Sequence, residues 1–211
     1  MKTVIQIILV VAALGLCYAI YESIEEPIRF EKAKKERYTD VITRLKDIRR
    51  AEIAYKDVNG AFTENWDTLI DFVNTGELPL VRKIGMLTDS MVDAGWDEQR
   101  ALKEGKIIRD TLKVAVIDTL FGGKFDASSL KKIPNTNEEF HLGADVITTG
   151  SGVKIPIFEA AAHNNVILND LKDDYEQEII NLNDKARTNG KYPGLKVGSL
   201  DEANNNAGNW E

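Results

Sequence analysis

The sequence predicts an α+β fold: an N-terminal transmembrane helix continues into a long amphipathic helix, and a strand-rich body with short helices follows. Three observations predict this class. Val4–Tyr21 is apolar and uncharged, residues 28–57 contain no helix breaker, and short β-branched or alternating segments dominate after Gly76. Helical and strand-like patterns that follow one another in separate blocks are typical of α+β proteins.

The apolar stretch Val4–Tyr21 is long enough to cross a bilayer. As a helix it would span about 27 Å, close to the thickness of the hydrocarbon core. A cleaved signal peptide and a buried soluble helix are the alternatives, but bulky residues occupy the places where signal cleavage needs small ones. We therefore expect an uncleaved anchor over residues 1–21 that contacts membrane lipid through residues 4–21.

The charges that flank the anchor bear on its orientation. A positive-inside count would place the following domain in the cytoplasm. The first seven residues after Tyr21, however, contain three glutamates and no basic residue. We expect a single-pass protein of the inner (cytoplasmic) membrane whose large C-terminal domain lies in the periplasm.

The composition excludes some classes of protein. The 211-residue chain has a formal net charge of −7, which argues against nucleic acid as a partner. Its one cysteine, Cys17, lies in the apolar stretch, so no intramolecular disulfide can form and the domain has no thiol for catalysis or zinc binding.

The long helix carries one apolar stripe. We expect Pro27 to kink or restart the helix, residues 22–40 to form a polar juxtamembrane helical stalk, and residues 41–211 to form a globular α+β domain. Packing of the stripe onto this domain is the favoured interpretation, and a self-associating coiled coil is the alternative. The stripe comprises Val41, Leu45, Ile48, Ala51 and Tyr55.

A second helix follows the turn at Asn59-Gly60. We expect Thr63 to cap it and its apolar face to pack antiparallel against the stripe. That face comprises Trp66, Leu69, Ile70 and Val73. Strands are expected at 78–84, 106–109, 112–117, 139–142 and 153–160, and further helices at 97–104, 126–130 and 173–186. Because Pro156 cannot donate a backbone hydrogen bond, we expect its strand to lie at a sheet edge.

The run from Ile48 to Phe62, IRRAEIAYKDVNGAF, resembles type IV pilins and type II secretion pseudopilins. In those proteins an apolar helix also continues into a long amphipathic helix that ends near a tyrosine and an Asn-Gly turn. In overall layout the chain is similar to uncharacterised single-pass membrane proteins of Bacteroidota-type bacteria, through residues 45–60, 68–85, 151–159 and 192–211. This resemblance implies a membrane-tethered envelope protein and no particular activity.

Candidate chemical groups are few. His141 and His163 lack the ligand spacing of known metal sites, and we interpret both as surface or loop residues. Gly122-Gly123-Lys124 and Gly150-Ser151-Gly152 fit turns better than a phosphate loop or a nucleophile elbow. No catalytic, cofactor-binding or metal-binding residue can be named, and no cofactor is expected.

The C-terminal tail contains five oxygen-bearing side chains that could bind calcium: Asp201, Glu202, Asn204, Asn205 and Asn206. Their spacing is not that of an EF-hand, so the favoured interpretation is a capped, turn-rich terminus with Trp210 docked as an apolar plug, and calcium binding is the alternative.

Two classes of function remain. The favoured one is a non-catalytic, membrane-anchored envelope protein that serves as a structural or accessory subunit of a secretion, pilus-like or motility assembly, with protein partners or further copies of itself. The alternative is a membrane-tethered periplasmic enzyme or ligand-binding domain. An exposed apolar face on the long helix would favour the first, and a deep pocket with converging carboxylates or histidines would favour the second.

Overall fold

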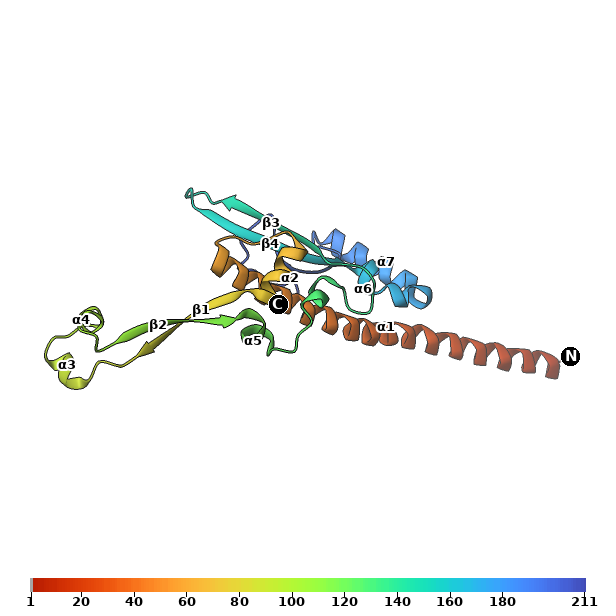
Figure 1. The fold of residues 1–211 in the computed structure, drawn as a ribbon. Helices are drawn as coiled ribbons and strands as arrows, with labels where there is room; N and C mark the ends of the chain where they lie inside the picture. Colours follow the sequence, from red (N-terminus) through yellow and green to blue (C-terminus); the bar gives the residue numbers. More distant parts are fainter. Residues whose placement is uncertain (1) are drawn as a thin grey trace.

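The computed structural model describes residues 2–211, so the predicted anchor is seen from Lys2, and Met1 lies outside the described residues. The fold is α+β, as predicted, and Figure 1 shows its arrangement. The elements are α1 (Lys2–Asn59), α2 (Trp66–Thr75), β1 (Glu77–Ile84), α3 (Asp89–Asp93), α4 (Glu98–Lys103), β2 (Ile108–Ala115), α5 (Val116–Phe121), η1 (Ala127–Lys131), β3 (His141–Thr148), β4 (Lys154–His163), α6 (Asn164–Ile167), η2 (Asn169–Leu171), α7 (Lys172–Thr188) and β5 (Gly194–Gly198).

One continuous helix, α1, holds both the apolar stretch and the amphipathic stripe. It runs through Pro27, so the predicted restart at that residue is wrong. Within Thr3–Asn59 its most apolar 18-residue window has a mean hydropathy of 2.4, and none of this window is buried. Length and composition therefore allow this helix to cross a membrane, although a signal sequence has the same properties.

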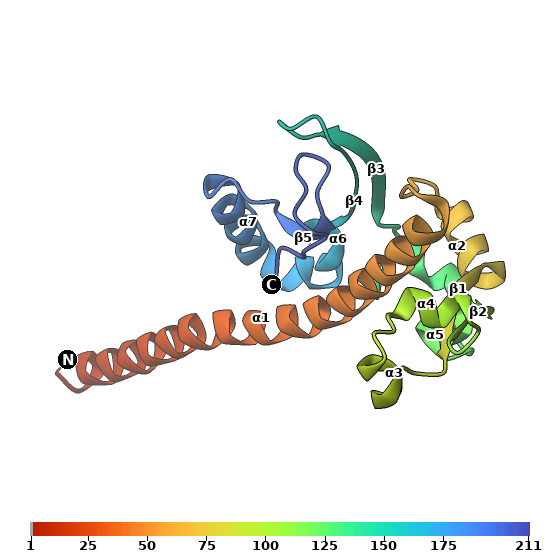
Figure 2. The ribbon, with the colours of Figure 1, turned by 90° about the vertical axis from the view of Figure 1, so that its left-hand side faces the viewer.

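The stretch predicted to form a polar stalk, residues 22–40, packs in part against the body, with Phe30 buried and Tyr38 partly buried. Phe30 is 4% exposed, and its ring centroid lies 5.5 Å from that of Tyr175 on α7. The Tyr38 hydroxyl donates to Asn164 Oδ1 at 2.5 Å, and Arg37 is paired with Asp170 at 2.6 Å. The polar sequence pattern misled here because α7 lies alongside α1, which the local sequence does not show (Figure 2).

A buried amide network joins α1, α6 and α7. Asn164 Nδ2 donates to Asn183 Oδ1 at 3.0 Å, and Asn183 Nδ2 donates to Asn165 Oδ1 at 2.7 Å. Asn164 and Asn183 are both nearly inaccessible to solvent, and these bonds supply the partners that buried amides need. Burial also raises the pKa of Tyr38, which bonds to the same network, to about 12.

The predicted packing of the stripe is confirmed. Leu45 and Ile48 on α1 and Leu69 on α2 are fully buried in one cluster, and the rings of Tyr55 and Phe72 meet edge-to-face with centroids 5.2 Å apart. Because the chain buries the stripe in its own core, the stripe is not free for the coiled coil that was the alternative. The same cluster includes Phe158, Ala160 and Ala162 of β4 and Leu195 and Val197 of β5.

The sheets differ from the prediction in instructive ways. The strands expected at 106–109 and 112–117 are one strand, β2, and β5 was not expected at all. The predicted edge strand, β4, is the centre of the sheet β3-β4-β5. Its half that contains Pro156 pairs only with β3, since β5 begins to pair at Glu159, so the proline still has an unpaired side.

Local capping chemistry ends α1 and starts α2. Gly60, with φ of +81°, donates its N–H to Lys56 O at 2.7 Å and ends α1 as predicted. The cap of α2 is Asn65 rather than Thr63, since the Asn65 side chain accepts from the N–H groups of Asp67 and Thr68. Thr63 instead accepts from Asn65 N at 3.1 Å.

We expect Leu45→Ala or Leu69→Ala to lower the melting temperature of a fragment that begins at Glu22. Both side chains are fully buried, and truncation of a buried leucine costs about 2–5 kcal/mol out of a total stability of about 5–15 kcal/mol. Thermal unfolding followed by circular dichroism measures the effect.

The matched control is Lys32→Ala, which changes an exposed side chain on the same helix and should leave the melting temperature nearly unchanged. Lys34 would be a poor control because its side chain is only 15% exposed and is paired with Glu31 at 2.5 Å. Unchanged melting of Leu45→Ala would contradict the core position of the stripe.

Candidate interaction surface

The most prominent feature beyond the body is an arm formed by residues 77–115. Strands β1 and β2 pair antiparallel as a separate two-stranded sheet, and the connection between them carries α3 and α4. Figure 1 shows the arm extending away from the body at the end opposite the N-terminus of α1. An isolated two-stranded ribbon is marginally stable in water, so contacts of its side chains are needed to support it.

The tip of the arm has a small core of its own. Ala101 and Ile107 are each 1% exposed, and Ala101 O accepts hydrogen bonds from the N–H groups of Lys106 and Ile107. The Arg100 guanidinium lies 4.8 Å from the centroid of the Trp96 ring. At the end of the ribbon Gly85 has φ of +94°, and a side chain there would collide with Lys106 O, so this turn requires glycine.

The polar face of the ribbon is stabilised by ion pairs. Glu98 of α4 accepts from both Lys83 of β1, at 3.0 Å, and Arg109 of β2, at 2.9 Å. These hydrogen bonds lower the pKa of Glu98. Nearer the body, Lys113 pairs with Glu77 at 3.1 Å. These charged side chains of the polar face are therefore paired with other residues of the arm.

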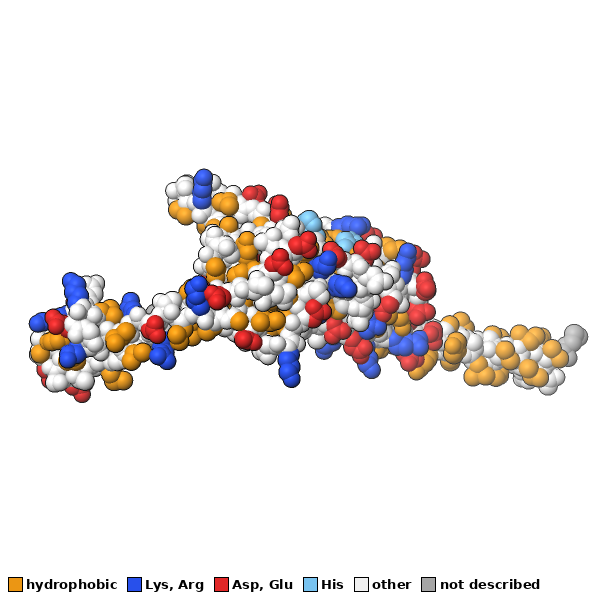
Figure 3. Space-filling model, in the orientation of Figure 1, with side chains coloured by type: hydrophobic (Ala, Val, Ile, Leu, Met, Phe, Trp, Pro, Cys, Tyr) orange, Lys and Arg blue, Asp and Glu red, His pale blue; other side chains and the backbone are white. Residues whose placement is uncertain are grey.

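The other face of the ribbon is largely aliphatic, and beyond its root, where Leu78 packs against the core of the body, it is exposed. The register places Leu78 opposite Val114, Leu80 opposite Leu112, and Ile84 opposite Ile108, all on one face because alternate residues point the same way. Leu80 and Ile108 are each 54% exposed, Ile84 is 42% and Leu112 is 39%. Figure 3 shows hydrophobic side chains along the arm as well as on the N-terminal part of α1 at the opposite end.

An uncovered apolar face of this kind is a candidate protein-binding surface. Contiguous apolar patches on soluble protein surfaces mark interaction sites, and both outer edges of the ribbon have no neighbouring strand in residues 2–211. We call the set of four exposed aliphatic residues 80, 84, 108 and 112, with Arg82 and Asp110 between them, the arm face. No sequence-based site prediction included it, because the strands were predicted singly and their 23-residue connection hid the pairing.

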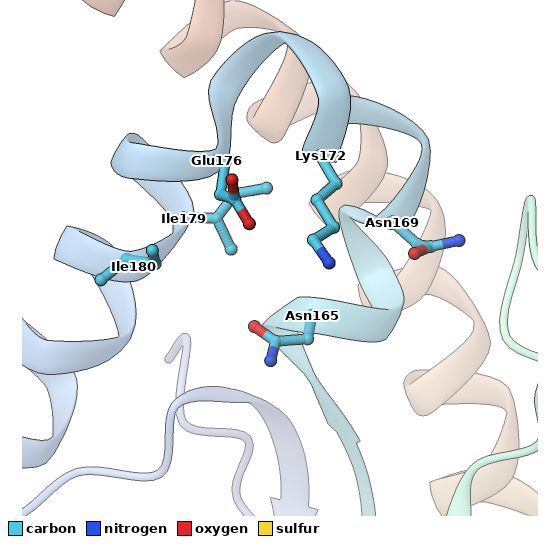
Figure 4. A pocket seen from close by; sticks show the side chains of 6 residues that line it. All are labelled: Asn165, Asn169, Lys172, Glu176, Ile179 and Ile180. Atoms are coloured by element: carbon cyan, nitrogen blue, oxygen red, sulfur yellow. The ribbon is translucent and has the colours of Figure 1, made fainter.

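The hollows of the body offer less chemistry. The one in Figure 4 has a volume of about 280 Å³, and Lys172 and Glu176 of α7 extend into it toward Asn165. A larger groove of about 770 Å³ is lined by Tyr192 and Lys196, among others. Lys196 Nζ is already paired with Glu159 at 2.7 Å, and Asp201 and Glu202 also line the groove.

The two histidines lie at strand ends, His141 where β3 begins and His163 where β4 ends. His141 is exposed at the start of β3, and His163 ends β4, where its Nδ1 accepts from Asn165 N at 3.1 Å. Burial, with a smaller contribution from Arg187, lowers the pKa of His163. Among residues 2–211 no group of three or more histidine, cysteine or acidic side chains could hold a metal ion.

The tail is docked rather than open. Trp210 packs against the core cluster as predicted, and Arg49 of α1 donates to Glu211 at 2.8 Å and to Asn206 O at 3.2 Å. Asp201 and Glu202, two of the suggested calcium ligands, remain exposed at the rim of the larger groove.

The most perturbed carboxyl group, that of Glu52, lies in the core rather than in a cleft. Its side chain is fully buried; Oε2 accepts from Thr63 N at 3.2 Å, and Oε1 has no partner among the described residues. Burial raises the pKa of Glu52 to about 8, and the bond from Thr63 opposes this only in part.

We expect the stability of the body to fall as the pH rises from about 4.5 to about 8. The folded state keeps the proton on Glu52 through this range while the unfolded state releases it, so each pH unit costs up to about 1.4 kcal/mol. Glu52→Gln keeps the shape but cannot ionise. Denaturant unfolding of both proteins across this range should show a steeper loss of stability with rising pH in the wild type than in the variant, and equal slopes would contradict a protonated Glu52.

Comparison with protein-family models, curated proteins and solved structures finds no significant match. The resemblance to pilins and to Bacteroidota-type membrane proteins therefore stays a prediction, and the functional argument depends on the geometry above.

Proposed function

We propose that this chain is a non-catalytic, membrane-anchored envelope protein that presents the arm face to a protein partner, as a structural or accessory subunit of a larger assembly. The observation that carries the proposal is the arm face itself: a row of exposed aliphatic side chains on a ribbon that projects from the body. Water is a poor environment for such a face, and burying it against another protein would stabilise both the ribbon and the complex.

The position of the arm supports a protein partner rather than lipid. The apolar stretch of α1 and the arm lie at opposite ends of the molecule (Figure 1). If α1 is held in the inner membrane, the arm face points away from that membrane and into the periplasm. A secretion, pilus-like or motility assembly is the kind of partner that the predicted resemblance suggests.

The alternative, a tethered enzyme or ligand-binding domain, has weaker support. Its one favourable observation is the groove of about 770 Å³, whose volume falls within the usual range for ligand sites. Its carboxylates, Asp201 and Glu202, are neighbours on one exposed loop and do not face each other across the groove.

The proposal predicts that Ile108→Asp lowers the yield of co-purified partner at least tenfold when the full chain is cross-linked in membranes and purified in detergent. Ile108 is exposed, so the change places a charge on the arm face without disturbing a core. The matched control is Thr111→Asp, an exposed position of the opposite face of β2, which should retain the partner.

In the same cells, protease added to spheroplasts should digest the body and leave the anchor in the membrane. Equal partner yield from both variants would contradict the role of the arm face. Protection of the body until the membrane is opened would contradict the proposed topology.

A further inference from the structure

Two opposite charges lie at the centre of the arm face. Arg82 and Asp110 are directly opposite in the register of β1 and β2, and both are exposed. Leu80 and Leu112 flank them on the side nearer the body, and Ile84 and Ile108 flank them on the side nearer the tip. Within the described part of the chain neither Arg82 nor Asp110 takes part in an ion pair, whereas the charges of the polar face do.

This pattern is complementary to itself. Two copies can pack with their arm faces together, related by a two-fold axis that runs parallel to the strands of the ribbon. Strand β1 of one copy then lies over β2 of the other, which brings Arg82 over Asp110 and Asp110 over Arg82. In the same arrangement Leu80 lies over Leu112 and Ile84 lies over Ile108, so every apolar row meets an apolar row.

The other two-fold arrangement of the same faces is disfavoured by charge. An axis across the ribbon would place β1 over β1, with Arg82 over Arg82 and Asp110 over Asp110. Like charges that face each other at an interface suppress that pairing. The charges therefore select the axis along the ribbon.

The selected axis also suits two anchored molecules. Rotation about the length of the ribbon leaves both bodies on the same side of the contact. Because α1 begins at the end of the molecule opposite the arm, both N-terminal helices then approach one membrane from the same side (Figure 1). The axis across the ribbon would send the two bodies in opposite directions.

The size of the arm face indicates how strongly two copies would associate through it. Eight residues per strand make a ribbon about 27 Å long and about 5 Å between strand axes. A face of these dimensions would bury less area than the roughly 800 Å² per partner that a standard stable interface buries. The contact should therefore be weak in dilute solution and favoured where two anchors share a membrane, which raises their effective concentration.

We propose that a second copy of this chain covers the arm face, with Arg82 of each copy paired to Asp110 of the other about a two-fold axis along the ribbon. This inference rests on the proposed function, because it names the partner that the arm face binds.

The test uses two differently tagged full-length copies, co-expressed in membranes, both with Cys17→Ser. One copy carries Leu80→Cys and the other Leu112→Cys, so that oxidation can join only residues that lie over each other between copies. We expect an interchain disulfide. Adding Arg82→Glu to both copies gives each face two carboxylates and should lower the disulfide yield at least tenfold.

The decisive mixture pairs a copy that carries Arg82→Glu with one that carries Asp110→Arg. One face then has two negative charges and the other two positive charges, and the disulfide yield should return to the level of the parent pair or above. Because each single variant holds like charges on its own ribbon, recovery in the mixture cannot come from repaired folding. Thr111→Glu in both copies adds a negative charge to the opposite face of β2, at an exposed position, and is the control that should leave the disulfide yield unchanged.

Failure of the mixture to recover, or an equal disulfide yield in all pairs, would overturn the inference. If no disulfide forms while Ile108→Asp still removes a different co-purified protein, the second copy is wrong and the proposed function stands. If neither association is seen, both are wrong.

Discussion

Burial of one face of α1 is the interaction on which the rest of the structure depends. Leu45 and Ile48 are fully buried, and the same face contacts α2 on one side and the sheet β3-β4-β5 on the other. Because the same continuous helix carries the apolar N-terminal stretch, this stretch and the buried stripe at the core of the body are parts of one element. No loop separates the two within the described residues.

This constraint also places the arm. Gly76 O accepts a hydrogen bond from Val116 N at 3.0 Å at the root of the ribbon, next to α2, which is packed on the C-terminal part of α1. The ribbon is thereby held on the body at the end far from the N-terminus (Figure 2). The apolar N-terminal stretch of α1, the core and the arm form a single path in which the two exposed apolar surfaces lie at opposite ends (Figure 1).

The sequence correctly predicted the features that depend on the local spacing of apolar residues. The spacing of Leu45 and Ile48 on α1 and of Leu69 on α2 revealed the buried faces correctly. It did not reveal Phe30, whose burial depends on α7 almost 150 residues later in the chain. The arm face was missed for a similar reason: β1 looks like an ordinary strand, and only its pairing with β2 shows that Leu80 and Leu112 share a face with nothing over it. Long-range pairing is absent from a local pattern, so the candidate site required the structure.

Hydrogen exchange along α1 in the full chain, reconstituted in a bilayer, tests the central claim most directly. If α1 is packed from Phe30 onward, amides of residues 30–55 should exchange slowly and as one block, through the region that the sequence alone suggested was a polar stalk. Rapid exchange of residues 30–40 beside slow exchange of residues 41–55 would contradict a single rigid element and would restore a flexible tether between the membrane and the body.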